Sequence, residues 1–469
     1  MKKANIGLIG LAVMGANLAR NIAKNGYKTI VYNRTESVTK QFVSDFGNEN
    51  LIGSYDLKQF VDSIETPRKI IIMVKAGNPV DAVIENLLPL LEKDDIIIDC
   101  GNSYYKDTQK RYEQLKQKSI RFVGCGVSGG EEGALNGPSI MPGGDRESYE
   151  QIRDILHAIS ANDFSGKKCE TYIGENGAGH YIKMVHNGIE YAIMQMIAEG
   201  YDSLRKLYKL NPKEISEIFK KYNDGKLNSY LIEITYKVLA KKDSFDENKY
   251  LIDYILDKAG AKGTGKWTSI EGFDRAESVS TIGEATFARD ISEKKQLREK
   301  LSNIYNTANT SSELIELQEY LKILENTLYI GMIFAYAQGY ALIKETAQNE
   351  NWHINLSEIS RIWQGGCIIR AKLLEFLTDV FKSNTDFEHI FELTDIKNEI
   401  QNGLNDYKKH IKQNMLNEIS SLSLSAGLNY FYAITQKQSS ANLIQGLRDY
   451  FGAHTYERTD KQGTFHTEW

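Results

Sequence analysis

Cysteines are scarce in this sequence, and their spacing excludes two kinds of site. Only four occur among 469 residues, at Cys100, Cys125, Cys169 and Cys367, and no two of them form a C-x-x-C pair. A disulfide framework and a zinc site are therefore not expected. No histidine, cysteine and carboxylate cluster has the spacing of metal ligands, so we predict no metal. Reduced thiols in a cytoplasmic protein are the simplest interpretation.

An excess of positive charge is also missing. The chain carries 57 Lys and Arg against 62 Asp and Glu, which gives a formal net charge of −5 and a pI near 6.0. A general nucleic-acid binder needs a basic excess to neutralise phosphates, so no nucleic-acid partner is expected. Any anionic ligand must be held by local cations.

Apolar runs long enough to cross a membrane are lacking as well. The most apolar stretch, TLYIGMIFAYAQGYALI at 327–343, is short for a span and is interrupted by Gln338, so we predict a buried core helix there. The N-terminus, MKKANIGLIG, runs directly into a turn motif, which argues against a secretory signal. We therefore expect no membrane partner.

The chain is too long for a single hydrophobic core of ordinary size, and its sequence pattern changes after residue 177. In residues 1–177, apolar runs such as NIGLIG, TIVYN, KIIIMV, DIIIDC and IRFVGCGV alternate with helix-forming segments such as 15–26 and 107–118. This alternation predicts an α/β Rossmann-type N-terminal domain with a parallel sheet. Long helical patterns dominate residues 178–435 and predict a large all-α domain.

Two further features lie in the second half of the chain. AEGYDSLRK at 198–206 resembles AQGYALIK at 337–344, which favours an internal duplication of the helical domain. Residues 436–469 form a polar C-terminal tail, for which disorder is one interpretation. Its many aromatic residues favour a tail that docks on a surface.

The first chemical motif is IGLIGLAVMG, a strand that leads into a helix. Gly10, Ala12 and Gly15 occupy the positions of a dinucleotide-binding fingerprint, in which glycines permit a tight turn, close approach of a pyrophosphate and helix packing. Ala12 departs from the strict pattern by one methyl group. A purely structural turn is the alternative, and the position at the start of a βαβ pattern favours cofactor binding.

The end of the second predicted strand favours NADP over NAD. An acidic residue there would bind the ribose hydroxyls of NAD, but YNRT supplies Asn33, Arg34 and Thr35. Arg34 can pair with a 2′-phosphate, and its neighbours can donate hydrogen bonds. A solvated surface arginine is the alternative.

Three more loops follow predicted strands at the edge where ligands bind in such sheets. MVKAGNP contains Lys75, and DCGNSYY contains Asn102. The third, GVSGGEEGALNGPSIMPGG, is dense in glycine and exposes backbone N–H groups that can hold an anion. Its best candidates are Ser128, Gly129 and Gly130, and a flexible loop is the alternative.

A polar stripe marks the otherwise apolar stretch GHYIKMVHNGIEYAIMQ at 179–195. Lys183, His186, Asn187 and Glu190 lie at offsets of 0, 3, 4 and 7, which share one helix face. Burial would depress the pKa of the lysine towards that of a general base and raise that of a carboxyl towards that of an acid. Spacing alone leaves catalysis and a solvated Lys–Glu stripe equally open.

Downstream cations complete the candidate site. AKGTGKWTS at 261–269 places Lys262 and Lys266 among glycines, and ATFARDISEKK places Arg289 on a helix. These groups suit the phosphate or carboxylate of a sugar acid.

These motifs together resemble the decarboxylating 6-phosphogluconate dehydrogenase family of the pentose phosphate pathway. The likeness rests on GLAVMG, YNRT, MVKAG, GVSGGEEGALNGPSIMPGG, GAGHYIKMVHNGIEYAIMQ, KGTGKWT, WQGGCIIR and RDYFGAHTYER, and it covers nearly the whole chain. Two departures are Ala261, where the family pattern has glutamine, and Gln364, where it has arginine. The segment 299–316 matches no motif.

The resemblance implies an NADP-dependent oxidative decarboxylation of 6-phosphogluconate to ribulose 5-phosphate, with NADP as the cofactor. It implies that Lys183 is the general base and later an acid, and that Glu190 is the acid that protonates the enediol. Expected cofactor contacts are Gly10, Leu11, Ala12, Val13, Met14, Gly15, Asn33, Arg34, Thr35, Val74, Lys75, Ala76 and Asn102. Expected substrate contacts are Asn102, Ser128, Gly129, Gly130, His186, Asn187, Tyr191, Lys262 and Arg289, with Arg448 and His454 from the tail of a homodimer partner.

Two other functions remain as alternatives. A β-hydroxyacid dehydrogenase that does not decarboxylate would leave the tail residues Arg448 and His454 without a purpose. A dinucleotide-binding protein without catalysis would leave both Lys183 and Glu190 unexplained.

Overall fold

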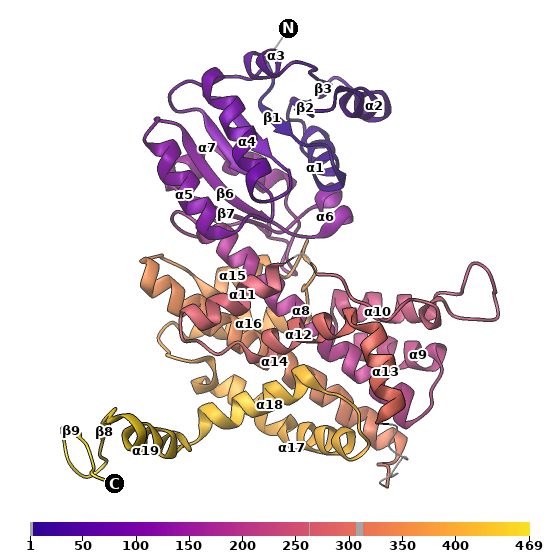
Figure 1. The fold of residues 1–469 in the computed structure, drawn as a ribbon. Coiled ribbons are helices and arrows are strands. Elements are labelled where there is room, and N and C mark those ends of the chain that lie inside the picture. Colours follow the sequence, from indigo (N-terminus) through magenta and orange to yellow (C-terminus); the bar gives the residue numbers. More distant parts are fainter. Residues whose placement is uncertain (1–2, 262, 306–312) are drawn as a thin grey trace.

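The computed structural model describes residues 3–261, 263–305 and 313–469, and it combines a sheet domain with a helical domain and a projecting tail (Figure 1). The seven-stranded sheet has the order β3-β2-β1-β4-β5-β6-β7. The strands are β1 (Ile6–Ile9), β2 (Thr29–Tyr32), β3 (Leu51–Gly53), β4 (Lys69–Ile72), β5 (Ile96–Asp99), β6 (Arg121–Val127) and β7 (Ile140–Gly144). The predicted Rossmann-type domain is therefore confirmed, and all its strand pairs are parallel except β6–β7.

Helices cover both faces of this sheet because its strands are apolar on both sides. Leu18 and Ile22 of α1 (Val13–Lys24) pack on one face with α7 (Arg146–Ile159). The other face holds α3 (Leu57–Asp62), α4 (Asn78–Leu87) and α5 (Tyr105–Lys116). The remaining helices of the domain are α2 (Glu36–Phe46) and the short α6 (Gly130–Asn136).

The helices predicted at 15–26 and 107–118 begin and end two residues earlier, at 13–24 and 105–116. Gly26, with φ of +87°, explains the end of the first, since a left-handed glycine terminates a helix.

The helical domain is built around two long helices. They are α8 (Ala178–Leu207) and α14 (Leu317–Glu350), and the predicted core helix at 327–343 lies within α14, almost entirely buried. The others are α9 (Pro212–Asn223), α10 (Tyr230–Ala240), α11 (Thr264–Asp274), α12 (Ser280–Glu293), α13 (Lys295–Ile304), α15 (Leu356–Ile362), α16 (Lys372–Ser383), α17 (Thr394–Leu416) and α18 (Leu422–Thr435). No described helix combines the length and apolar character needed to cross a membrane. Of the unmatched segment 299–316, residues 306–312 lie outside the described chain.

The two stretches that resemble each other make matching contacts. Glu199 of α8 accepts the backbone N–H groups of Ser423 and Leu424 at 2.9 and 3.0 Å, at the start of α18. Gln338, at the corresponding place on α14, accepts the N–H of Thr281 at 2.9 Å, at the start of α12. Each long helix thus caps a helix from the other half of the domain. The duplication itself stays a prediction, which these contacts support.

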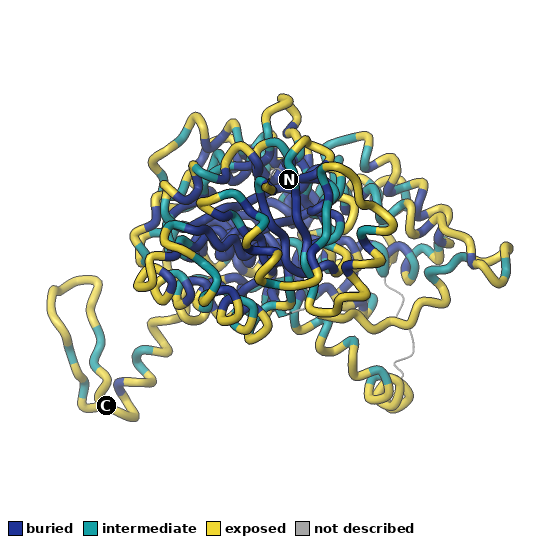
Figure 2. Tube along the Cα trace, turned by 90° about the horizontal axis from the view of Figure 1, so that it is seen from above, coloured by how far each residue is buried: buried dark blue, intermediate teal, exposed yellow. Residues whose placement is uncertain are grey.

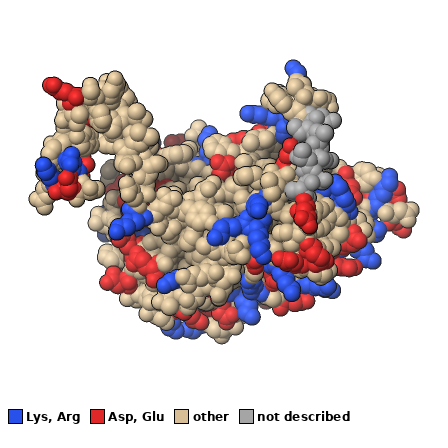
Figure 3. Space-filling view, turned by 90° about the horizontal axis from the view of Figure 1, so that it is seen from below, with Lys and Arg blue, Asp and Glu red and all other residues tan. Residues whose placement is uncertain are grey.

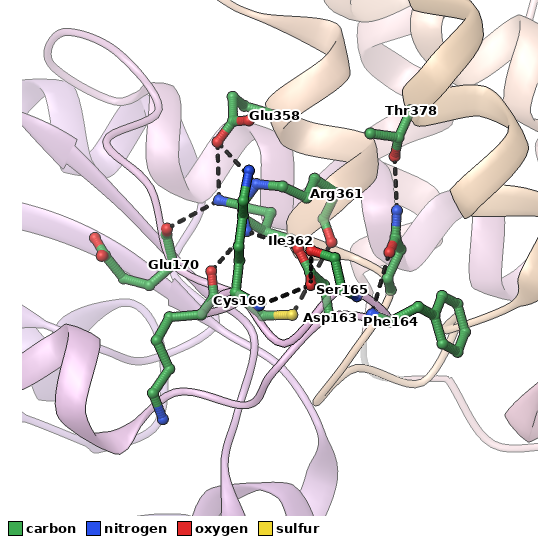
Figure 4. Close-up of polar contacts among 12 residues, drawn as sticks. Asp163, Phe164, Ser165, Cys169, Glu170, Glu358, Arg361, Ile362 and Thr378 are labelled. Atoms are coloured by element: carbon green, nitrogen blue, oxygen red, sulfur yellow. Dashed lines mark hydrogen bonds and ion pairs between the residues drawn. The ribbon is translucent and has the colours of Figure 1, made fainter. Parts of the chain in front are cut away.

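The chain between β7 and α8 is anchored on α15 by Arg361 (Figure 4). The Arg361 guanidinium donates to the backbone carbonyl of Lys168 at 2.7 Å and to that of Glu170 at 3.3 Å. It also pairs with the carboxylates of Asp163 at 3.3 Å and Glu358 at 2.8 Å. The mostly buried guanidinium, with a side-chain exposure of 12%, therefore joins the end of the sheet domain to the helical domain.

The tail folds on itself and projects from the body (Figures 1 and 2). It contains α19 (Ala441–Gly452) and a hairpin of β8 (Tyr456–Glu457) and β9 (Thr464–Phe465). The buried Asp449 carboxylate accepts from His466 Nδ1 at 2.9 Å, Thr467 N at 3.1 Å and Trp469 Nε1 at 2.9 Å. The interpretation of a disordered tail is therefore wrong.

Candidate active site

Lys183 is buried at the junction between the sheet domain and α8, with a relative exposure of 6%. Its Nζ donates to Asn187 Oδ1 at 2.6 Å, one turn along the helix, and to Ser128 Oγ at 3.2 Å, in the loop after β6. This burial excludes a solvated stripe for Lys183, and His186 and Asn187 are buried as well. Glu190 is the most accessible of the four, with a side-chain exposure of 20%.

Two glycines allow α8 to reach the sheet here. A Cβ atom at Gly126 of β6 would lie 2.5 Å from the Lys183 Cβ, and one at Gly179 would lie 2.4 Å from the carbonyl oxygen of Gly124. Because real Cβ contacts are never so short, the backbones of β6 and α8 approach only with glycine at these positions. This close packing brings Lys183 beside Ser128.

One tautomer of His186 satisfies its contacts with both Asn187 and Ser128. With the proton on Nδ1, the ring donates to Asn187 Oδ1 at 3.0 Å, and Nε2 accepts from Ser128 Oγ at 3.4 Å. Burial and the nearby Lys183 ammonium lower the pKa of His186 well below its usual value. The imidazole is thus neutral at pH 7, and its 3.9 Å approach to Glu190 Oε2 is not an ion pair there.

Burial also lowers the pKa of Lys183 from its usual 10.5, and the Glu190 carboxylate only partly opposes this effect. A lowered pKa raises the fraction of neutral amine, the form that can accept a proton. The arrangement can therefore transfer protons within a shielded junction.

The predicted cofactor residues gather at the carboxyl edge of the sheet, where the strand order reverses between β1 and β4. Gly10 has φ of +101°, and a Cβ at Gly15 would lie 2.0 Å from the Gly10 carbonyl oxygen. Ala12 is exposed at the start of α1, which explains why its methyl group is tolerated. Leu11, Val13 and Met14 complete this turn, and Val74, Lys75 and Ala76 follow β4.

The three residues after β2 differ in whether their side chains face solvent, where a cofactor could contact them, or bind within the chain. The exposed Arg34 and Thr35 face solvent. Asn33 instead has internal partners, because its Oδ1 accepts from the Leu11 N–H at 3.3 Å and its Nδ2 donates to the Thr35 carbonyl at 3.3 Å. Its first role is therefore to hold the two turns together.

The predicted substrate residues come from several elements. Arg289 of α12 stacks over the Tyr191 ring at 3.4 Å, next to Glu190. Gly129, with φ of +109°, caps the start of α6, and Gly130 is the first residue of that helix. The exposed Asn102 lies in the loop after β5. Lys262 lies outside the described residues, while the exposed Lys266 lies in the first turn of α11.

Arg448 and His454 do not join the other residues within this chain. Both are exposed on the projecting tail, where Arg448 donates to Gln445 Oε1 at 3.0 Å.

One neighbour of the site was not predicted. The turn after α15 brings Trp363 to 5.5 Å from the His186 ring, and a Cβ at Gly129 would lie 2.6 Å from the Gly366 carbonyl oxygen. The paired glycines of WQGGCIIR were the available signal for this close approach. Within the described residues, no group of three or more His, Cys, Asp or Glu could hold a metal ion.

Comparison with known proteins identifies similar chains of the same length. Residues 5–174 match the NAD binding domain of 6-phosphogluconate dehydrogenase, and residues 179–469 match the 6-phosphogluconate dehydrogenase C-terminal domain. The NADP(+)-dependent, decarboxylating 6-phosphogluconate dehydrogenase of Bacillus subtilis (strain 168) is 47% identical, with 100% of both chains covered. The decarboxylating 6-phosphogluconate dehydrogenase of Escherichia coli (strain K12) is 44% identical, again with 100% of both chains covered.

A solved structure is also similar throughout. Plasmodium falciparum 6-phosphogluconate dehydrogenase, studied in its apo form and in complex with NADP+ and with 6-phosphogluconate, has a TM-score of 0.96 and 43% identity. The match covers 99% of this chain and 100% of that one.

Proposed function

The chain belongs to the 6-phosphogluconate dehydrogenase family, and we propose that it converts 6-phosphogluconate to ribulose 5-phosphate and CO2 with reduction of NADP. The observation that carries this proposal is the buried Lys183, whose Nζ lies within hydrogen-bond distance of Ser128 and Asn187. A lysine with a lowered pKa at the meeting point of two domains suits a general base.

Lys183 takes the proton of the C3 hydroxyl. In its neutral form, the two N–H bonds point to Asn187 Oδ1 and Ser128 Oγ, which leaves the lone pair for the substrate. When NADP is bound, it accepts the hydride that leaves C3. The resulting Lys183 ammonium then polarises the new C3 carbonyl, so that the electrons of the breaking C1–C2 bond are accepted as an enol while CO2 leaves.

Glu190 completes the reaction as an acid. Its partly exposed carboxyl lies one turn beyond His186 on the same face of α8. It donates a proton to the carbon that was C2 of the sugar acid, which becomes C1 of the ketose. His186, Asn187, Ser128 and Tyr191 hold the sugar acid, and Arg289 and Lys262 bind its negatively charged groups.

The residues at the sheet edge fit a dinucleotide. The Gly10 to Gly15 turn leaves no room for a side chain at Gly15, and the start of α1 presents free N–H groups to a pyrophosphate. The exposed Arg34 is available to pair with a 2′-phosphate. The residues after β4, Val74, Lys75 and Ala76, and Asn102 after β5, would face the nicotinamide half.

We also propose a homodimer in which the tail completes the partner's site. The tail has a defined fold around Asp449, yet it presents Leu443, Leu447 and Phe451 to solvent with exposures of 66%, 54% and 71%. On the face seen in Figure 3, residues other than Lys, Arg, Asp and Glu cover most of the projecting tail. Burial of this face against a second subunit would bring Arg448 and His454 to a substrate phosphate. A cytoplasmic location fits the four cysteines, all of which are buried and free.

One assay tests the reaction. The purified protein is mixed with 6-phosphogluconate and NADP, and NADPH and CO2 are followed together. We expect equal amounts of both. NADPH without CO2 would favour a β-hydroxyacid dehydrogenase, and the absence of both would favour a binding protein.

The cofactor preference has its own test. We expect Arg34→Asp to lower kcat/KM for NADP by roughly 10-fold to 100-fold, because a carboxylate replaces the cation that pairs with the 2′-phosphate. The value for NAD should change much less. An unchanged NADP-to-NAD ratio would contradict the role of Arg34.

A further inference from the structure

Glu271 of α11 is a fully buried carboxylate at the junction between the two domains, with an exposure of 0%. Its Oε1 accepts from Tyr104 Oη at 2.7 Å and pairs with Lys106 Nζ at 2.7 Å. Its Oε2 accepts from Tyr105 Oη at 2.7 Å. These donors are consecutive residues at the start of α5, in the sheet domain, so one side chain of the helical domain holds the first turn of a sheet-domain helix.

The carboxylate also affects the titration of the groups that donate to it. Burial and the Glu271 carboxylate raise the pKa of Tyr104 to about 12 and raise that of Tyr105 further, so both hydroxyls remain donors. Hydrogen bonds to Glu271 and Asp274 raise the pKa of Lys106 in spite of its partial burial. A buried carboxylate is tolerated only when such donors satisfy it, and loss of a partner leaves an unpaired charge.

On one side of this junction lies the loop after β5. Asn102 precedes Tyr104 by two residues, and the loop is held at its base by Asp99, which accepts from Ser103 Oγ at 2.6 Å and from the Gly101 N–H at 3.0 Å. Any shift in the first turn of α5 is therefore transmitted to Asn102.

On the other side, α11 packs on the part of α8 that carries the candidate catalytic residues. Thr268 Oγ1 donates to the Met184 carbonyl at 2.9 Å, and a Cβ at Gly188 would lie 2.7 Å from the Thr268 methyl group. A Cβ at Gly265 would lie 2.5 Å from the Tyr191 ring. The helix thus has no freedom to slide along α8, and Glu271 lies one turn beyond Thr268.

We infer that Glu271 is a positioning residue, which fixes the loop of Asn102 relative to the Lys183 stretch of α8. The inference rests on the proposed function, because it concerns the distance between the cofactor loop and the substrate. Alignment of a hydride donor and acceptor is sensitive to shifts of about 1 Å, which cost up to about 100-fold in rate. The carboxylate therefore acts through Asn102 and α8, without contact with the reacting atoms.

The test compares two carboxylates of the same helix. Glu271→Gln keeps the shape of the side chain but leaves Lys106 without its buried partner. Asp274→Asn is the matched control, since Asp274 pairs with the same Lys106 at 3.1 Å but has a side-chain exposure of 51%. We expect Glu271→Gln to lower kcat by roughly 10-fold to 100-fold with little change in the KM for either substrate.

A second readout is the isotope effect with 6-phosphogluconate deuterated at C3. It should increase in Glu271→Gln, because hydride transfer becomes the slow step, and stay unchanged in Asp274→Asn. If Glu271→Gln folds poorly, Tyr104→Phe removes one donor and should change both quantities in the same direction. A variant with normal kcat and isotope effect but lowered stability would overturn the inference and leave Glu271 a structural residue.

Hydrogen exchange separates this inference from the proposed function. Residues 100–106 should exchange faster in Glu271→Gln than in Asp274→Asn, whatever the substrate. Unchanged exchange would overturn the inference. If the wild-type chain does not oxidise 6-phosphogluconate but the exchange changes as expected, the proposed function fails and the connection between the domains stands.

Discussion

Two charged side chains with little solvent exposure join the same two domains, and they do so with opposite chemistry. Glu271 is a carboxylate that accepts from two hydroxyls and an ammonium of α5. Arg361 is a guanidinium that donates to carbonyls and carboxylates around the chain between β7 and α8 (Figure 4). Both have few solvent contacts, with side-chain exposures of 0% and 12%.

The difference lies in what each charge holds. Arg361 binds backbone carbonyls of a connecting segment, so its contacts follow the path of the main chain and carry no candidate site residue. Glu271 binds side chains next to Asn102. We therefore expect loss of Arg361 to reduce stability and loss of Glu271 to reduce the rate of the reaction.

The largest expected effect is on stability, in Arg361→Met. This change removes the cation paired with Oδ2 of the buried Asp163 and the donor to two backbone carbonyls, and it should reduce the free energy of unfolding by roughly 3–5 kcal/mol. Urea unfolding measures the change, and Arg153→Met, at a side chain with 50% exposure, is the control. The kcat of the folded fraction should be unaltered. A large loss of kcat with intact stability would reverse the comparison.

A slightly smaller effect on stability is expected from Glu170, whose backbone carbonyl accepts from Arg361. Burial raises the pKa of Glu170 to about 7, although Tyr149, Arg361 and Arg153 oppose the shift. Among the residues that the structure describes, its Oε1 has no hydrogen-bond partner. The folded state therefore keeps a proton that the unfolded state loses above about pH 4.5. The stability that this proton contributes is present at low pH and disappears as the pH rises through 7.

Glu170→Gln should remove this dependence. The variant should match the wild type near pH 4 and exceed its free energy of unfolding by up to roughly 3 kcal/mol at pH 8. Urea unfolding at several pH values gives the two curves. Parallel curves would show that Glu170 does not titrate in this range.

Tyr105→Phe tests the other cluster with a smaller change. The change removes the hydrogen bond to the Glu271 carboxylate and a longer one from Arg275 at 3.3 Å, which should cost roughly 1.5–3 kcal/mol in the free energy of unfolding. The kcat should also fall, in contrast to Arg361→Met. Tyr112→Phe, on the same helix, is the control. A normal kcat in Tyr105→Phe would remove the distinction between the clusters.

The smallest expected effect is the energetic coupling between the Glu271 and Arg361 clusters. Glu271 and Arg361 share no hydrogen-bond partner, so the effects of Glu271→Gln and Arg361→Met on unfolding should add within roughly 0.5 kcal/mol. A double-mutant cycle measures this coupling. A larger value would mean that the two clusters form one network.

The sequence predicts the parallel strands well, because strands buried on both faces have continuous apolar runs. It did not predict β7, since IMPGG contains Pro142 and two glycines and lies at the antiparallel edge of the sheet. The short β3 was missed as well.

The candidate site was predictable in part. Helical spacing placed Lys183, His186, Asn187 and Glu190 on one face, but burial of that face depends on Gly126 in a different domain. The Glu271 cluster could not be predicted for a similar reason, because Tyr104 and Tyr105 lie 167 and 166 residues away from Glu271 along the chain. Such pairs become visible only when the topology is known.

Each long helix caps the start of a helix from the other half of the helical domain, and this has a consequence for how the protein folds. Glu199 of α8 needs α18, and Gln338 of α14 needs α12, so each half of the helical domain leaves helix ends unsatisfied until the other half has formed. The two halves should therefore form a single cooperative unit, whose amides exchange with solvent only through global opening. Since α18 also leads into the tail, the residues that we propose contact a second subunit follow a helix whose start is capped by the helix that carries Lys183.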